Sequence, residues 1–367
     1  MLKEIDLVYR TMLAELGQRC LDAEFDRDFP ESGRFREVPV KGRNYWYFED
    51  RQEPGGKPVR RYVGPDADPE IAKRVAAFQI VKDNYKARRK LVSTLTREAG
   101  LPAPDRFTGD IVEAFWKNGI FRLRAVLVGT AAFPCYSGLL GLKFPSAPMQ
   151  TGDIDFAQFH SVSASVEATL PPVLDVLREV DPSFREVPHM ADNRQAAQFI
   201  NDKHFKVEFL TPNRGSADHE GQLTIMPAFG GAAATPLRFL DFLITDPTRG
   251  VMLHKGGISV LVPSPERFAI HKIIVAVRRR EDHAGVLKRE KDLRQAGLLA
   301  AAIETTRGGA DFAQAFKEAW DRGPAWREAL TRGRRLLASE FRDALSRILS
   351  TGCDELGMEH FFSAKYT

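Results

Sequence analysis

The stretch Thr151-Gly152-Asp153-Ile154-Asp155-Phe156 decides how the centre of this chain is interpreted. Side chains of an extended strand alternate between its two faces, so Asp153 and Asp155 share one face while Ile154 and Phe156 face a core. Two carboxylates on one face repel each other, and the usual compensation is a divalent cation with oxygen ligands, most often Mg²⁺. An isolated Asp-x-Asp is more often a solvated strand edge, so the rest of the chain has to decide.

A second motif precedes it, where the run Ala125-Val126-Leu127-Val128 is followed by Gly129 and Thr130. The run is short and apolar, which predicts a buried strand, and a helix is expected to begin at Ala131. Glycine lets the backbone approach a ligand closely, and a helix N-terminus offers free N–H groups and a positive dipole end. Gly129 and Thr130 therefore form a candidate phosphate cradle, although a glycine at a strand end is common in α/β proteins.

A third motif is Phe205-Lys206-Val207-Glu208-Phe209-Leu210, which has the alternation of a strand. Its two outer phenylalanines and its valine share one face, and Glu208 lies on the other. A carboxylate among apolar neighbours on a central strand usually has a partner. Glu208 is therefore expected to complete a site of three carboxylates with Asp153 and Asp155.

The order of these motifs resembles the polymerase-β-type nucleotidyltransferase superfamily. Its members have a Gly-Gly or Gly-Ser turn after a strand, an Asp-x-Asp or Asp-x-Glu strand, and a third acid on a neighbouring strand. The matching residues here are Gly129 and Thr130, Asp153 and Asp155, and Glu208. Together with the later segment 262–272, these motifs are also similar to a bacterial group of nucleotidyltransferase-fold proteins. The resemblance covers residues 101–299, and Thr130 departs from the pattern because Gly or Ser is usual there.

The resemblance implies an α+β fold, with a nucleotidyltransferase-type mixed sheet flanked by helices. It also implies bound Mg²⁺ or Mn²⁺, held by Asp153, Asp155 and Glu208, and a nucleoside triphosphate (NTP) such as ATP as substrate. In members of this superfamily the helical region after the catalytic domain often offers a cation to the phosphates. Lys272 and Lys291 are the candidates for that role, and the alternative for each is an ordinary surface lysine.

The N-terminal region differs in character. Residues 34–40, 43–49 and 58–63 predict short strands, and Asp68-Pro69-Glu70 predicts the start of a long helix that runs to about Ala99. The predicted sheet interleaves aromatic and basic residues, namely Tyr45, Trp46, Tyr47, Phe48 and Tyr62 with Arg43, Arg51, Lys57, Arg60 and Arg61. One interpretation is that RNA or another nucleic acid binds through the 34–64 sheet and the 69–99 helix. The other is a hairpin whose aromatic residues pack on the helix, and a helix whose cations, Arg88 among them, are only solvated.

Length and composition limit the number of domains, the kinds of partner and the cellular location that we expect. At 367 residues the chain exceeds one usual hydrophobic core, and we expect an N-terminal region (1–100), a catalytic domain (101–262) and a C-terminal helical domain (263–367). The net charge of +4 permits a nucleic-acid partner without arguing for one. Three cysteines that match no disulfide or zinc spacing fit a reducing cytoplasm. No signal-peptide pattern and no apolar run of membrane-spanning length is present, so a cytoplasmic protein with no membrane partner is expected.

These motifs predict a metal-dependent nucleotidyltransferase that moves NMP from an NTP to an acceptor hydroxyl and releases pyrophosphate, with RNA as one candidate acceptor. Two alternatives stay open. One is an enzyme that nucleotidylates a protein or a small molecule, and the other is a non-catalytic nucleic-acid- or nucleotide-binding protein on a degenerate fold. Three intact acids argue against degeneration, because a protein without catalysis has no need to bear their mutual repulsion.

Overall fold

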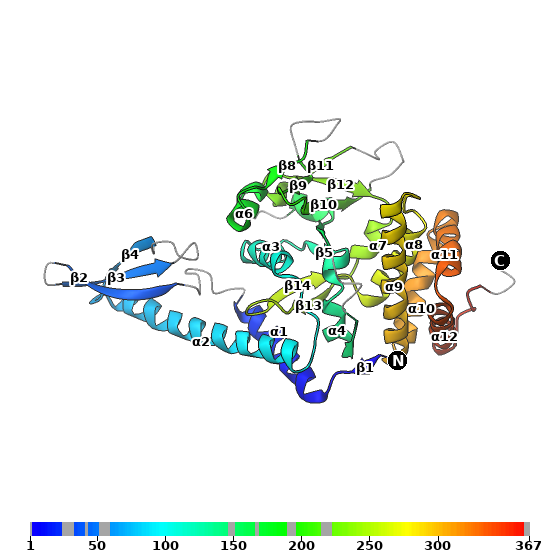
Figure 1. Ribbon diagram of the computed structural model, residues 1–367, viewed down its shortest axis with the longest axis horizontal. Coiled ribbons are helices and arrows are strands. Elements are labelled where there is room, and N and C mark those ends of the chain that lie inside the picture. The colour runs from blue at the N-terminus through cyan, green and yellow to red at the C-terminus, as the bar shows by residue number, and fades with distance from the viewer. Residues whose placement is uncertain are drawn as a thin grey trace.

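A mixed sheet forms the centre of the computed structural model, which describes residues 2–23, 33–40, 43–50, 59–145, 151–165, 169–188, 196–213 and 222–362. Five of its strands lie in the order β11-β12-β10-β7-β5, and β9 and β8 extend it beside β10 (Figure 1). The strands are β5 (Val126–Val128), β7 (Asp153–Ala157), β8 (Arg185–Glu186), β9 (Gln198–Ile200), β10 (Lys206–Pro212), β11 (Thr224–Ile225) and β12 (Ala233–Leu237). With helices on its flanks, this sheet confirms the expected α+β class.

The central strands alternate as the sequence predicts. β10 pairs in parallel with β7 and with β12, and β5 runs antiparallel to β7. Ile154, Phe156, Val207 and Phe209 are completely buried on one face, where Phe115 packs 5.0 Å from the Phe156 ring and 5.8 Å from the Phe209 ring. Burial of this face fixes the register, because a one-residue slip would turn the aromatic side chains toward the acidic face.

Helices enclose the sheet. Phe115 belongs to α3 (Arg106–Lys117), which contacts α6 (Val173–Val180), whereas α8 (Pro265–Ala276) packs along α9 (His283–Thr305) on the C-terminal side (Figure 1). Ser264 caps α8 by accepting a hydrogen bond from the Arg267 N–H, and Pro265 stands in the first turn, where its missing N–H costs no helical hydrogen bond. The remaining elements are β1 (Lys3–Glu4), η1 (Thr130–Ala132), α4 (Cys135–Leu140), β6 (Leu142–Lys143), α5 (His160–Ser165), η4 (Pro227–Phe229), α7 (Leu240–Ile244), β13 (Thr248–Met252), β14 (Ile258–Val262), α10 (Gly309–Asp321), α11 (Pro324–Leu336) and α12 (Ser339–Leu356).

An N-terminal arm projects from this body (Figure 1). It consists of α1 (Leu7–Ala23), the antiparallel sheet β2 (Arg34–Val40), β3 (Arg43–Asp50) and β4 (Val59–Pro65), and the long helix α2 (Pro69–Arg97), which confirms the strands and the helix expected there. Arg88 of α2 is 1% exposed and donates a hydrogen bond from Nη1 to the Gly256 carbonyl at 3.1 Å. Arg88 is therefore not the solvated cation expected from the sequence, because it attaches α2 to the turn between β13 and β14.

The two faces of the arm sheet differ. Phe35 and Phe48 pack against Phe78 of α2, with ring centroids 5.1 and 5.6 Å from it. Tyr47 and Tyr62 lie on the other face with ring centroids 5.6 Å apart, and Tyr62 is 54% exposed. Packing on the helix therefore accounts for the phenylalanines but not for the tyrosines. Residues 51–58, with Arg51 and Lys57, lie outside the described residues, as do the side chains of Arg60 and Arg61.

Glycine and proline have different effects on the helices of this chain. α1 continues through Gly17 to Ala23, and residues 138–143 contain the end of α4 and β6. α5 and α6 are separate helices, since the prolines at 171 and 172 lack the N–H groups that a continuous helix needs. The proposed domain boundaries stay a prediction, and one hydrophobic core includes residues from Ile111 to Leu349. Among the described residues, no helix is long and apolar enough to cross a membrane.

Candidate active site

All seven candidate residues line one cavity. Its volume is about 230 Å³, and it lies between the sheet and the pair α8–α9. The candidates are Gly129, Thr130, Asp153, Asp155, Glu208, Lys272 and Lys291. The structure therefore brings together residues that are up to 162 positions apart in the sequence, from Gly129 to Lys291.

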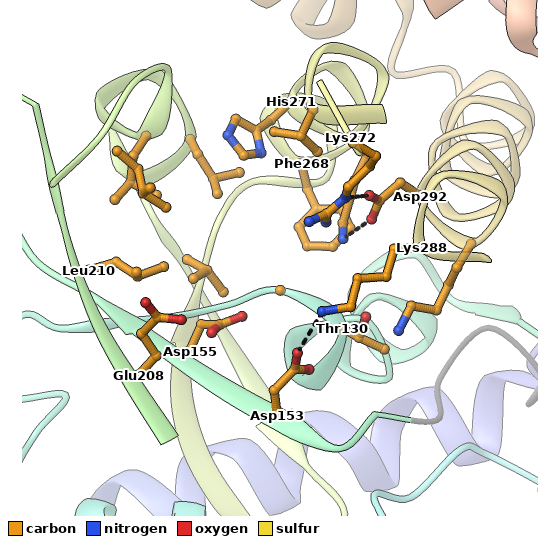
Figure 2. A pocket seen from close by; sticks show the side chains of 18 residues that line it. Thr130, Asp153, Asp155, Glu208, Leu210, Phe268, His271, Lys272, Lys288 and Asp292 are labelled. Atoms are coloured by element: carbon orange, nitrogen blue, oxygen red, sulfur yellow. Dashed lines mark hydrogen bonds and ion pairs between the residues drawn. The ribbon is translucent and has the colours of Figure 1, made fainter. Parts of the chain in front are cut away.

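Three carboxylates form the floor of this cavity. Asp155 lies directly opposite Glu208 in the parallel pairing of β7 with β10, and Asp153 lies two residues before Asp155 on the same face. Figure 2 shows Glu208, Asp155 and Asp153 in this order across the floor. Glu208 accepts a hydrogen bond from the Thr235 hydroxyl at 3.2 Å, which holds its carboxylate at the β12 side of the cavity.

Gly129 is required by its conformation and by its surroundings. It follows β5 with φ +68°, a left-handed conformation that favours glycine. A Cβ at this position would lie 2.5 Å from Oδ2 of Asp155. The turn therefore lets the backbone approach the carboxylate closely, and Thr130 begins η1 immediately beside it.

The pKa values of the three pocket acids are not all shifted in the same direction. Burial, with the negative charges of Asp153 and Glu208, raises the pKa of Asp155 from its usual 3.8 to about 7. Burial also raises the pKa of Glu208, although the Thr235 hydrogen bond opposes it. Burial acts in the same direction on Asp153, but a hydrogen bond from Thr151 and the charges of Lys288 and Lys291 outweigh it and lower the pKa of Asp153. Asp155 is thus the acid whose charge is least compensated by the protein itself.

Cations from α8 and α9 face the acids. Lys288 Nζ lies 3.5 Å from Oδ2 of Asp153 (Figure 2). Lys272 is 5% exposed and its Nζ lies 2.6 Å from Asp292 Oδ1, so the alternative of an ordinary surface lysine is wrong for it. Arg279 Nε lies 2.8 Å from the other oxygen of Asp292. Because Asp292 accepts from two cations, this group keeps a net positive charge next to the pocket.

Sequence reasoning missed several residues of this wall, namely Lys288, Asp292, Arg279 and His271, all of which line the cavity. A signal existed for α9, where positions 288, 291 and 292 follow the i, i+3, i+4 spacing of one helix face. Burial, with the charge of Lys272, lowers the pKa of His271 to about 3, so it presents a neutral imidazole. Leu237, Leu240, Leu243 and Val275 complete an apolar wall on the same side.

The donor set of the pocket suits a hard divalent cation. Asp153, Asp155 and Glu208 offer only carboxylate oxygens, which are the ligands that Mg²⁺ and Mn²⁺ prefer. Burial and the negative charges of Asp153 and Glu208 raise the pKa of Asp155, and such a cation would neutralise those charges. These residues therefore fit the metal that the sequence implies, and their role as its ligands is a proposal.

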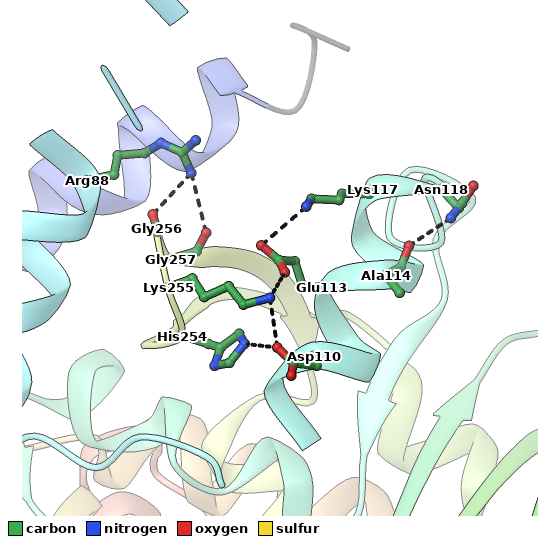
Figure 3. A network of polar contacts seen from close by, with 10 residues as sticks. All are labelled: Arg88, Asp110, Glu113, Ala114, Lys117, Asn118, His254, Lys255, Gly256 and Gly257. Carbon is green, nitrogen blue, oxygen red and sulfur yellow. Dashed lines mark hydrogen bonds and ion pairs between the residues drawn. The ribbon is translucent and has the colours of Figure 1, made fainter. Parts of the chain in front are cut away.

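A second acidic cluster lies elsewhere, which we call the α3 cluster: Asp110, Glu113, His254 and Lys255 (Figure 3). Ligand atoms of its two acids and of His254 all lie within 4.8 Å of one another, closer than the three pocket acids do as a set. Lys255 Nζ, however, lies 2.8 Å from Asp110 Oδ1 and 2.7 Å from Glu113 Oε2. The ammonium group thus takes the position between these acids where a metal would bind.

Comparison with known proteins adds one finding to this geometry. No curated protein and no solved structure matches the chain significantly. A family profile described as Nucleotidyltransferase matches residues 106–321, which is well over half of the chain and includes every residue of the cavity named above. The protein therefore belongs to this nucleotidyltransferase family.

Proposed function

We propose that the protein is a metal-dependent nucleotidyltransferase that moves NMP from an NTP to an acceptor hydroxyl and releases pyrophosphate. One observation carries this proposal: three carboxylates on adjacent parallel strands face lysines from α8 and α9 across a single cavity that also contains the Gly129 turn. Acids on one side and cations on the other are the two requirements for a metal-bound triphosphate.

Each group has a distinct task in this scheme. Asp153, Asp155 and Glu208 would hold Mg²⁺ or Mn²⁺, which when bound neutralises phosphate charge and lowers the pKa of an acceptor hydroxyl. Lys288 and Lys291 would bind the phosphates that leave as pyrophosphate, and the backbone of the Gly129 turn would approach them without a side chain in the way. Glu208, on the far side from Lys288, would orient the attacking hydroxyl (Figure 2).

We further propose RNA or another nucleic acid as the acceptor, because of the arm. Tyr45 and Tyr47 flank Tyr62, with ring centroids 6.0 and 5.6 Å from it, on the face that does not pack against α2. Exposed aromatic rings offer stacking surfaces to unpaired bases. Exposed cations follow on α2 at Lys86, Arg89, Lys90 and Arg97, where they would contact phosphates.

The test is transfer of label from NTPs carrying ³²P at the α-phosphate, each incubated with Mg²⁺ and with separate RNA, protein and small-molecule fractions. We expect label in the RNA fraction. Label in the protein or small-molecule fraction alone would retain the transferase and replace its acceptor. With no label in any fraction, and no rise of the unfolding midpoint with Mg²⁺ and any NTP, the chain would be a non-catalytic binding protein instead.

A further inference from the structure

A second cavity lies beside the candidate active site. Its volume is about 310 Å³, and Leu237 lines both cavities. The other residues that line it are Asn213, Arg238, Phe239, Asp241, Arg322 and Trp326. They come from the residue after β10, the segment after β12, α7, the junction between α10 and α11, and α11. This volume is in the range of small-molecule binding sites. The two cavities adjoin each other at the exposed side chain of Leu237.

Aromatic rings and guanidinium groups alternate along this cavity. Phe239 packs edge-to-face on Trp326 with a centroid separation of 4.5 Å. Arg278 and Arg238 place their Cζ atoms 5.1 and 5.7 Å from the Phe239 centroid, and Arg322 lies 5.0 Å from that of Trp326. Such an arrangement offers both π-surface and positive charge to a ligand.

These arginines differ in whether acidic side chains neutralise their charge. Arg322 is paired with Asp241 and, at 2.7 Å, with Glu318. Arg278 is exposed and forms no ion pair with any residue that the structure describes. Arg278 does not line the cavity, but its Cζ lies 5.1 Å from the ring centroid of Phe239, which does, so its charge is available to an anion bound beside that ring.

The backbone at Phe239 is held in an unfavourable conformation. Its φ is +68°, in the left-handed region that a bulky residue rarely adopts. Strain of this kind persists only where the surroundings fix the residue, and it is concentrated at ligand sites. Here the strained backbone directs a 5% exposed ring between Trp326 and two guanidinium groups.

The position of this cavity relative to the acids decides what it would bind. In an in-line displacement the attacking oxygen approaches the phosphorus from the side opposite the leaving group. Lys288 marks the leaving-group side of the pocket, and Glu208 with Leu210 marks the opposite side (Figure 2). The second cavity lies on this opposite side. Glu208 accepts a hydrogen bond from Thr235 of β12, and Leu237, which lines both cavities, is the last residue of the same strand.

We propose that this second cavity binds the terminal nucleotide of the acceptor strand, with its base against Trp326, the more exposed of the two rings, and its phosphate near Arg238 and Arg278. The inference rests on the proposed function, because it assigns the acceptor a place in that same reaction. A nucleotide combines a flat π-surface with an anion, which are the two properties that the cavity complements.

The test is direct binding, so that it does not depend on turnover. The probe is a single-stranded RNA of four nucleotides with 2-aminopurine at its 3′ end, whose fluorescence falls when the base stacks. For the wild-type protein we expect saturable quenching. In the variant Arg238→Gln/Arg278→Gln we expect binding about tenfold weaker, with a smaller salt dependence. Arg280→Gln/Arg332→Gln is the matched control, because it removes the same two charges from side chains that are 87% and 60% exposed and do not line the cavity.

Three outcomes decide the matter. Quenching that is lost in the double variant and kept in the control supports the proposal. Equal weakening in both variants would show general charge attraction and would overturn it, as would unquenched binding by the wild type. Trp326→Leu removes the partly exposed ring that lines the cavity, so quenching should fall, and urea unfolding checks that this variant is still folded. Quenching without label transfer from NTPs would refute the proposed function and leave the cavity's ligand established.

Discussion

Two groups of acidic side chains differ in how the protein balances their charge. In the α3 cluster, Lys255 lies within 2.8 Å of both Asp110 and Glu113. Burial alone would raise the pKa of Asp110, but hydrogen bonds from His254 and Lys255 and the Lys255 charge lower it to about 2. Among the pocket acids, the pKa of Asp155 is instead raised to about 7 by burial and by its acidic neighbours.

This contrast distinguishes acids whose charge a lysine of the protein neutralises from acids whose charge is left for a bound cation. The α3 cluster is the more compact of the two, and by ligand spacing alone it would be the better metal site. Its charge is already compensated by an ammonium group, so it joins α3 to the β13–β14 turn. Among the described residues, the pocket acids form one ion pair, between Asp153 and Lys288, and the remaining charge is left for a cation that arrives with the substrate.

The largest expected effect is loss of catalysis when the pocket acids are neutralised. Asp153→Asn combined with Asp155→Asn should fold and should lose nucleotidyl transfer by about a thousandfold or more, because the metal loses two of its charged ligands. The measurement is the initial rate with α-labelled NTP. Asp110→Asn is the control from the α3 cluster and should keep the wild-type rate. Transfer by the double variant at the wild-type rate would show that the site is assigned wrongly.

A smaller effect is expected at the turn beside Asp155. Gly129→Ala places a Cβ 2.5 Å from Oδ2 of Asp155, so the carboxylate must move, and kcat/KM should fall about ten- to a hundredfold. Gly100→Ala is a close control. Gly100 has φ +67° but no atom within 4 Å of its Cβ position, so it carries the same backbone strain without the contact. Equal activity of the two variants would exclude the close approach as a functional feature.

Much of the fold and of the site followed from local pattern. Alternation placed Asp153, Asp155 and Glu208 on the acidic face, and Asp68-Pro69 marked the start of α2. What the sequence did not reveal depends on contacts between distant segments. Lys288 reaches Asp153 across 135 positions, and Lys255 reaches Glu113 across 142. Periodicity assigns each of these residues to a helix or a turn, but only the packing of α9 on α8 and of the β13–β14 turn on α3 determines which acid it meets.

The next effect is a pair of opposite pH dependences of stability in metal-free buffer. The pKa of Asp155 is raised in the folded protein, so its contribution is complete below the unfolded value of 3.8 and is lost as the pH rises through about 7. The difference corresponds to at most about 4 kcal/mol. The pKa of Asp110 is lowered, so its contribution, about 2 kcal/mol, is present above 3.8 and is lost as the pH falls toward about 2.

Urea unfolding with EDTA across this pH range measures both contributions. Asp155→Asn should flatten the decline between pH 4 and pH 7, and Asp110→Asn should flatten the decline on the acid side. Addition of Mg²⁺ should stabilise the wild type at pH 7 and have little effect on Asp155→Asn. If Asp155→Asn leaves the decline of stability between pH 4 and pH 7 unchanged, the charges of the pocket acids are neutralised by the protein as fully as those of the α3 cluster. The contrast between the two groups would then be wrong.

The smallest expected effect is also the sharpest test of the contrast, because it converts one kind of site into the other. Lys255→Met should lower the free energy of unfolding by about 1–3 kcal/mol, since it leaves Glu113, with a side chain 9% exposed, without this ammonium. Lys117→Met is the control, because Lys117 contacts the same acid at 3.5 Å from a half-exposed position, and it should cost less than about 1 kcal/mol.

With the ammonium removed, Asp110, Glu113 and His254 keep their ligand atoms within 4.8 Å of one another and should bind a cation themselves. Thermal unfolding with Mn²⁺ tests this in the Asp153→Asn/Asp155→Asn background, where the pocket no longer contributes. Mn²⁺ should raise the midpoint of the triple variant and leave the double variant unchanged. A midpoint that does not respond in the triple variant would mean that the ammonium is not what keeps a metal out, and that the spacing of these ligands is insufficient by itself.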